Sequence, residues 1–280
     1  MDFTNKSELL SYLKQKGLWA KKGLGQNFLI SKEALDKIIE AAELKQDDIV
    51  VEVGPGVGTL TSELVKRAGE VVAVEMDKKL SELLGQNSKI KDQNCNLKII
   101  NADILKFNLN EIVGGRKYKV VANIPYYITS KIIEQFLTAE NKPESIVLLV
   151  QKEVAERICA KPGEMSVLSV SVQLYGKPEI VGIVPKESFF PSPKVDSAIL
   201  KIVLSSQLPV LSSEEERPFF RLVHIGFASR RKTLANNLSA GYLITKKTAS
   251  DIIRQIGFSE NVRAQELSIE NWKKLISILK

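Results

Sequence analysis

The sequence predicts an α/β protein with a doubly wound parallel sheet, followed by a small all-helical C-terminal domain. Three observations carry this prediction. Short β-rich runs alternate with helical patterns from residue 31 to about residue 204. Several of these runs are apolar at consecutive positions, as strands buried on both faces are. No strand pattern follows residue 205. The 280 residues, 44% of them hydrophobic, can bury one large core or two modest ones.

The first expected element is an amphipathic helix. Leu35, Ile38, Ile39 and Ala42 follow a helical spacing behind a candidate N-cap at Ser31. Five short strands are then predicted, at residues 48–53, 70–75, 97–101, 118–123 and 145–151. Helices are predicted between them at residues 59–68, 78–86 and 129–138.

Near residue 205 the sequence changes from alternating strand and helix patterns to helical patterns alone. Residues 179–184 and 194–204 are predicted as two strands that close the sheet edge as an antiparallel pair, whereas residues 165–175 fit a strand or a helix equally well. Acidic residues 214–216 then open a helical pattern, as the helix dipole favours. We therefore expect a basic N-terminal segment, a nucleotide-binding domain and a helical domain at residues 1–27, 28–204 and 205–280.

Composition excludes several classes of protein. Cys95, Cys159 and His224 are the only cysteines and histidine, so a disulfide framework and a Cys/His zinc cluster are excluded, and no metal site is expected. A Ser-His-Asp triad would need His224, which has no nucleophile motif around it. No run approaches the roughly 20 apolar residues of a membrane span, and the N-terminus lacks the apolar block of a secretory signal. We expect a cytoplasmic protein without a membrane partner.

The net charge of +7 is distributed unevenly. Residues 1–27 carry a net charge of +3 and residues 205–280 carry +5, which leaves −1 for residues 28–204. A near-neutral body with basic ends is typical of a catalytic domain with attachments for nucleic acid, although the total alone is weak evidence.

A glycine-rich turn follows the first strand. Gly54, Gly56 and Gly58 allow sharp backbone turns and close approach of a ligand, and the following helix offers free N–H groups. A purely structural turn is the alternative. The dinucleotide fingerprint requires a third glycine at position 59, where this chain has Thr59. This departure counts against NAD as the ligand.

The next two strands also end in candidate nucleoside contacts. Glu75 lies 21 residues after Gly54, where a carboxylate can bind both hydroxyls of a ribose, and we include its neighbour Met76 in the expected site. Asp103 can accept a hydrogen bond from an adenine amine, or it can cap a local turn. Three such strand ends in succession are improbable by accident. The sequence therefore predicts S-adenosylmethionine (SAM) as the cofactor.

The fourth strand ends in a candidate catalytic motif, Asn123-Ile124-Pro125-Tyr126. Pro125 ends the strand, and the Asn123 side-chain oxygen and the Ile124 carbonyl are two acceptors for the N–H groups of an exocyclic base amine. Such acceptors favour the pyramidal nitrogen that attacks a methyl group. Tyr126 would stack on a base that has left its duplex. A turn with a buried aromatic residue is the alternative.

Five motifs identify the chain as resembling the ribosomal RNA adenine dimethyltransferases, and within that family the small-subunit enzymes. They are GQNFL at 25–29, EVGPGVG at 52–58, NIPYY at 123–127, FPSPKVDS at 190–197 and FASRRKTL at 227–234. The resemblance runs from about Lys21 to the C-terminus. It implies a Rossmann-like class I SAM-dependent methyltransferase domain, which agrees with the predicted sheet.

The resemblance also implies a reaction and its site. The enzyme would dimethylate the 6-amino groups of two adjacent adenosines in the 3′-terminal hairpin loop of 16S small-subunit rRNA, with a role in small-subunit biogenesis. The rRNA and the assembling small subunit would be its partners, and we expect a monomer. Phe190 would lie on the other face of the target base. The implied cofactor contacts are Asn27, Leu29, Gly54, Glu75, Asp103 and Asn123.

Basic residues near both ends are candidates for binding RNA phosphates. The segment from Arg217 to Lys232 holds five basic residues and no acidic one. A solvated helix face is a fair alternative for any single residue. The expected RNA-binding residues are Lys21, Lys22, Arg221, Arg230, Arg231 and Lys232.

Two other functions remain open from the sequence. Isoleucine at position 124 is familiar in the erythromycin-resistance methylases, which modify one adenosine of large-subunit rRNA. The 190–197 and 227–234 motifs favour the small-subunit enzymes instead. A non-catalytic ribosome-assembly factor is the third hypothesis, and the intact motif at 123–126 argues against lost catalysis.

Overall fold

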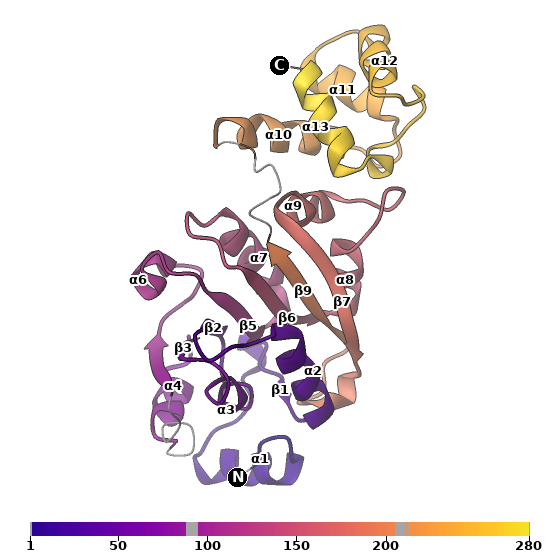
Figure 1. The fold of residues 1–280 in the computed structure, drawn as a ribbon. Coiled ribbons are helices and arrows are strands. Elements are labelled where there is room, and N and C mark those ends of the chain that lie inside the picture. Colours follow the sequence, from indigo (N-terminus) through magenta and orange to yellow (C-terminus); the bar gives the residue numbers. More distant parts are fainter. Residues whose placement is uncertain (1, 88–94, 205–210, 212, 280) are drawn as a thin grey trace. The chain divides into compact units, whose positions relative to one another are not determined.

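The computed structural model describes residues 2–87, 95–204, 211 and 213–279, and their contacts divide the chain into two compact units (Figure 1). The first unit comprises Met1–Ala155 with Pro178–Leu204, and the second comprises Glu156–Lys177 with Ser205–Lys280. Residues 156–177, which we expected in the sheet-containing domain, thus group with the helical unit. The basic segment 1–27 groups with the sheet.

A seven-stranded sheet forms the centre of the first unit, in the order β4-β3-β2-β5-β6-β9-β7. Strands β2 to β6 are parallel, and β9 pairs antiparallel with β6. The order reverses between β2 and β5, which is where ligands bind in doubly wound sheets. The strands are β2 (Ile49–Val53), β3 (Glu70–Glu75), β4 (Asn96–Asn101), β5 (Lys119–Asn123), β6 (Ser145–Gln151), β7 (Gly176–Val184) and β9 (Ser197–Leu204).

The helices connect these strands nearly as predicted. One prediction was too long, because the helix expected over residues 59–68 is only the short α3. The segment 165–175 is helical, since Ser166 and Ser169 form a capping box that starts α9. The helices from α2 to α9 are α2 (Lys32–Ala42), α3 (Thr61–Leu64), α4 (Lys78–Gly85), α6 (Leu109–Val113), α7 (Thr129–Thr138), α8 (Lys152–Ile158) and α9 (Val167–Tyr175).

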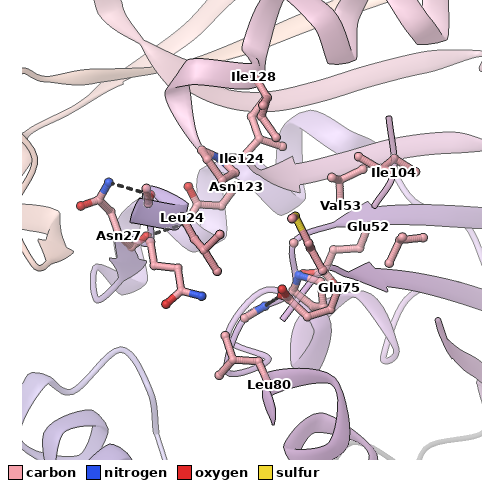
Figure 2. A pocket seen from close by; sticks show the side chains of 18 of the residues that line it. Leu24, Asn27, Glu52, Val53, Glu75, Leu80, Ile104, Asn123, Ile124 and Ile128 are labelled. Atoms are coloured by element: carbon pink, nitrogen blue, oxygen red, sulfur yellow. Dashed lines mark hydrogen bonds between the residues drawn. The ribbon is translucent and has the colours of Figure 1, made fainter. Parts of the chain in front are cut away.

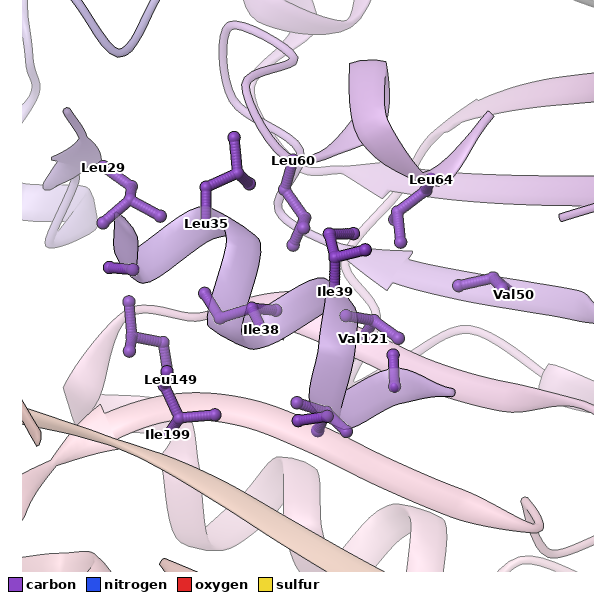
Figure 3. Packing of buried hydrophobic residues seen from close by; sticks show 14 of the residues in the cluster. Leu29, Leu35, Ile38, Ile39, Val50, Leu60, Leu64, Val121, Leu149 and Ile199 are labelled. Atoms are coloured by element: carbon purple, nitrogen blue, oxygen red, sulfur yellow. The ribbon is translucent and has the colours of Figure 1, made fainter. Parts of the chain in front are cut away.

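The main core lies between the sheet and its covering helices. Helix α2 begins at the N-cap Ser31, whose side chain accepts a hydrogen bond from Ala34 N–H. Its apolar face, including Ile38 and Ile39, packs towards strand residues such as Val121 and Leu149 (Figure 3). This packing fixes the sheet that carries the site at its strand ends.

The N-terminal segment is folded, which the sequence did not predict. Helix α1 (Lys6–Gln15) begins at the N-cap Asn5 and buries Leu9 and Leu13. These residues belong to a second apolar cluster with Phe28, Val57, Leu80 and Leu83. A short η1 turn (Lys22–Leu24) follows, and then β1 (Phe28–Leu29) pairs with β8 (Phe189–Phe190) in a two-stranded sheet. Two further 3₁₀ turns are η2 (Tyr126–Ile128) and η3 (Lys186–Ser188).

The described part of the second unit is helical apart from its loops and the first two residues of β7. Trp272 is fully buried and stacks on Phe227, with ring centroids 5.7 Å apart. Residue 226 is glycine because a Cβ there would lie 2.4 Å from the Trp272 ring. Besides α9 the unit holds α10 (Ser213–Gly226), α11 (Leu234–Tyr242), α12 (Lys246–Gln255), η4 (Ala264–Glu266) and α13 (Ile269–Ile278). None of the helices described in either unit is long and apolar enough to cross a membrane.

Candidate active site at the strand ends

A pocket lies at the carboxyl ends of the parallel strands, at the point where the strand order reverses (Figure 2). One side is formed by the ends of β2, β3, β4 and β5, and another by residues 24–29, which we call the strap. Of the expected cofactor and catalytic residues, all except Phe190 line this pocket. They are Asn27, Leu29, Gly54, Gly56, Glu75, Met76, Asp103, Asn123, Ile124, Pro125 and Tyr126.

The glycine loop is hydrogen-bonded to the Glu75 side chain. The Gly56 N–H donates to Glu75 Oε2 at 3.0 Å, and the Asp77 N–H donates to Glu75 Oε1 at 2.8 Å. Gly56 has a φ of +59°, which favours glycine, and a Cβ there would lie 3.3 Å from the Phe28 ring. Burial raises the pKa of Glu75, while these backbone N–H groups oppose the rise. The carboxylate is therefore held in one orientation at the pocket wall.

Glu52 is a buried carboxyl in the same pocket that the sequence analysis did not select. It is 1% exposed, and its Oε2 has no hydrogen-bond partner among the described residues. Burial, with a smaller contribution from the nearby Glu75 charge, raises the pKa of Glu52 to about 8. Its position on a strand of consecutive apolar residues is the pattern that could have identified it.

Asp103 and Met76 lie at the ends of β4 and β3. Asp103 Oδ1 accepts a hydrogen bond from Leu105 N–H at 3.1 Å, so one oxygen performs the turn-capping role that was the alternative. Its Oδ2 lies 3.9 Å from Lys106 Nζ. Met76 lines the pocket and is 58% exposed. Both residues can thus contact a ligand that extends along the strand ends.

The Asn123 amide is oriented by the strap. Its Nδ2 donates to the backbone oxygen of Asn27 at 3.1 Å, and the Asn27 side chain donates in turn to Gly25 O at 3.2 Å (Figure 2). Because the nitrogen of the Asn123 amide is used in this contact, its oxygen remains as an acceptor. Asn27 thus acts on the motif through its main chain.

The rest of the motif closes the same wall. Ile124 is buried, and Pro125 ends the strand before η2 begins at Tyr126. The Tyr126 hydroxyl shares a 2.6 Å hydrogen bond with Ser197 Oγ on β9. Burial raises the pKa of Tyr126, so this hydroxyl stays protonated near neutral pH. One edge of the ring is anchored while the side chain lines the pocket.

Phe190 lies outside the pocket lining. It pairs with Phe28 across β1 and β8, and Phe28 does line the pocket. Lys6 Nζ lies 5.6 Å from the centroid of the Phe190 ring, a cation–π distance. Phe189 is buried in the main core. The structure therefore brings Phe190 near the strap but not into the pocket.

Lys21 is engaged within the protein. Its Nζ lies 2.6 Å from Asp77 Oδ2, and Gln26 also reaches Asp77 at 3.5 Å. Burial raises the pKa of Asp77, but the hydrogen bond and charge of Lys21 outweigh this and lower it. Lys21 and the strap residue Gln26 therefore join this segment to Asp77, the N-cap of α4, and part of the Lys21 charge is compensated. The side chain of Lys22, another expected RNA contact, lies outside the described residues.

The expected RNA contacts in the helical unit are exposed. Arg230, Arg231 and Lys232 lie between α10 and α11 and have no ion pair within the part of the chain that is described. We call residues 230–232 the basic loop. The Asn237 amide holds the start of this connection by donating to Gly226 O at 2.6 Å and Ser229 O at 3.1 Å. Arg221 lies over the Tyr242 ring at 5.5 Å.

The pocket residues fit SAM. Carboxylates at Glu75 and Asp103 suit ribose hydroxyls and an adenine amine, respectively. Apolar side chains at Val53, Leu80 and Ile104 suit the faces of an adenine ring. The unpartnered Oε2 of Glu52 is a buried polar atom in the same pocket, which a polar group of the cofactor would partner. When bound, this cofactor supplies an electrophilic methyl group.

Comparisons with known proteins agree with this geometry. The family model "Ribosomal RNA adenine dimethylase" matches residues 17–280. The chain is 50% identical over 259 residues to a Ribosomal RNA small subunit methyltransferase A of Dehalococcoides mccartyi, covering 92% of this chain and 88% of that protein.

Two solved structures are similar in fold. A dimethyladenosine transferase from Plasmodium falciparum has a TM-score of 0.76 at 28% identity, with 89% of this chain and 95% of the other covered. The 23S rRNA methyltransferase ErmE has a TM-score of 0.74 at 29% identity, with 90% and 98% covered. The predicted class I methyltransferase fold, the enzyme class and the SAM cofactor are confirmed, and the chain belongs to the ribosomal RNA adenine dimethylase family.

Proposed function

We propose that this enzyme dimethylates the 6-amino groups of two adjacent adenosines in the 3′-terminal hairpin loop of small-subunit rRNA, and so takes part in small-subunit assembly. The 50% identity to a small-subunit methyltransferase over nearly the whole chain carries the choice of substrate. We further propose that the enzyme acts as a monomer in the cytoplasm, with small-subunit rRNA and the assembling small subunit as its partners.

The pocket supports a direct role for the motif at the end of β5. The oxygen of Asn123 is an available acceptor because its amide nitrogen is bonded to Asn27 O. Together with the Ile124 carbonyl, it would hold the two N–H groups of the target amine and orient the nitrogen lone pair. Tyr126, anchored through Ser197, would stack on the flipped base. No general base is needed before attack, because the proton is lost as the nitrogen becomes cationic.

Phosphate contacts are proposed for the basic loop. Its three charges are exposed and uncompensated within the described residues, as salt-dependent binding requires. Lys21 is a weaker candidate because its charge is shared with Asp77. Arg221 is also exposed, and we keep it and Lys22 in the proposed set.

A second candidate function is methylation of a single large-subunit adenosine. The 23S rRNA methyltransferase ErmE matches the fold almost as well as the dimethyladenosine transferase does, with TM-scores of 0.74 and 0.76. Fold alone therefore does not separate the two substrates. The identity to small-subunit enzymes favours the first.

The test uses purified small and large ribosomal subunits that lack adenosine dimethylation. Each subunit is incubated with the enzyme and labelled SAM, and the methylated positions are mapped by mass spectrometry. We expect four methyl groups on two adjacent adenosines of the small subunit and none on the large one. Modification of only the large subunit would establish the second candidate and exclude ours.

A further inference from the structure

Two consecutive tyrosines at the end of the motif have different surroundings. Tyr126 is half-buried and anchored to Ser197, whereas Tyr127 is 62% exposed. The hydroxyl of Tyr127 has no hydrogen bond within the described residues. Both lie in the turn η2, where successive side chains point about 120° apart. One turn thus directs one ring into the pocket wall and presents the next ring at the surface.

The exposed ring of Tyr127 is held in a defined position. Tyr127 lines the pocket and lies against Gly25 of the strap. A Cβ at Gly25 would be 3.2 Å from Tyr127 Cε1 and 3.2 Å from Pro125 Cβ, and the φ of Gly25 is +63°. The bare main chain of Gly25 therefore supports one edge of the ring. The ring is held at the rim between the strap and the catalytic motif.

Exposure of this ring is not explained by packing. Among the described large apolar residues that are exposed, Trp19, Val181 and Ile183 do not line the pocket. Met76 does, but it follows Glu75 on the cofactor side. Tyr127 is thus the exposed aromatic residue at the rim next to Asn123. An exposed aromatic face in this position is suited to stacking on a planar group of the substrate, such as a nucleobase.

We propose that Tyr127 stacks on the nucleobase adjacent to the adenosine held at Asn123 and so sets the register of the RNA. This inference rests on the proposed function, since a substrate with two adjacent adenosines leaves one base outside the pocket while the other is methylated. Stacking on an aromatic ring tolerates any base. Because the ring keeps one position relative to Asn123, it would stack on one target adenosine while the other is bound, and on the flanking nucleotide in the other case. Its hydroxyl would not be required.

The experiment compares Tyr127→Leu with Tyr127→Phe on a hairpin RNA that has the two adjacent target positions. In two separate hairpins, one or the other adenosine is replaced by 2-aminopurine, whose fluorescence falls when it stacks and which lacks the 6-amino group needed for methylation. We expect quenching in one of the two hairpins, the one whose 2-aminopurine lies on the Tyr127 side of the bound adenosine, with the wild type and Tyr127→Phe, and little with Tyr127→Leu. For unmodified hairpin, Tyr127→Leu should raise the KM about tenfold, in the range of losses for one stacked base. Its SAM affinity should not change.

Ile183→Ala is the control, because Ile183 is also an exposed apolar residue but lies outside the pocket lining. It should behave as the wild type does. The inference would be overturned if Tyr127→Leu kept the quenching and the KM of the wild type. It would also be overturned if Tyr127→Phe lost as much quenching as Tyr127→Leu, or if Tyr127→Leu lost SAM affinity by the same factor as it gained in KM. A failure of the proposed function would give a different result from a failure of this inference. In that case the wild type itself would methylate neither the hairpin nor the small subunit, and the inference would be wrong as well.

Discussion

The pocket and the basic loop use polar residues in opposite ways. In the pocket the polar groups are few, and most are held by a fixed partner, as Asn123 is by Asn27 and Glu75 is by Gly56. In the basic loop the charges are exposed and have no ion-pair partner among the described residues. The difference indicates that methyl transfer depends on orientation, whereas RNA affinity depends on uncompensated charge. The two functions should therefore be separable by mutation.

The largest effect is expected at Asn123. Asn123→Ala removes the oriented acceptor, and loss of one such preorganised group costs about 10²- to 10³-fold in rate. We expect kcat to fall by this factor while the RNA dissociation constant changes less than about twofold. Single-turnover transfer and equilibrium RNA binding measure the two quantities. An equal fall in RNA binding would show that Asn123 is structural.

Glu75 tests the cofactor side of the same pocket. Glu75→Gln keeps the shape but removes a charged acceptor, and hydrogen bonds to charged groups contribute about 1.5–3 kcal/mol. SAM affinity, measured by calorimetry, should therefore fall about 10- to 100-fold, with RNA affinity unchanged. An unaltered SAM affinity would remove Glu75 from the cofactor site. The thermal midpoint should be recorded alongside, because Gly56 and Asp77 also bind this carboxylate.

Neutralising the basic loop should weaken RNA binding and leave SAM binding unchanged. Replacing Arg230, Arg231 and Lys232 together by glutamine removes up to three phosphate contacts, so the slope of log K against log salt should decrease by about 2 to 3. RNA affinity at moderate salt should fall about tenfold while SAM affinity stays the same. An unchanged salt slope would place the RNA-binding surface elsewhere on the protein.

Much of this organisation was predictable from the sequence. The strands were found because buried parallel strands are continuous apolar runs, and their ends gave Gly54, Glu75, Asp103 and Asn123. Asn27 was reached only through the family resemblance. It orients Asn123 through its carbonyl oxygen, a group that every residue has, so its side-chain type carried no information. Helix α9 was ambiguous because its β-branched content competes with its capping box.

The placement of the aromatic residues was harder to predict. Phe189 and Phe190 are adjacent and similar in sequence context, and only the pairing of β8 with β1 decides which ring enters the core. Phe190 then meets Lys6 from a helix that the sequence analysis had not identified. Such contacts join residues far apart in the chain, where local patterns give no guidance.

The last expected effect is one on stability, and it comes from Glu52. Its pKa of about 8 exceeds the ordinary 4.5, so between about pH 5 and 8 the folded state keeps a proton that the unfolded chain has already lost. The free energy of unfolding should therefore fall as pH rises through this range, by roughly 4 kcal/mol if Glu52 acts alone. Glu52→Gln should flatten this dependence in thermal unfolding. An equally steep dependence in the variant would assign it to other groups.

The separation of chemistry from RNA affinity is tested most directly by measuring both in two variants side by side. The Asn123→Ala enzyme and the basic-loop triple variant are each assayed for binding to the target hairpin and for single-turnover methyl transfer at saturating RNA. We predict that the first binds normally and transfers poorly, and that the second binds poorly but transfers at nearly the wild-type rate once saturated. Parallel losses of binding and saturated transfer in both variants would contradict the account.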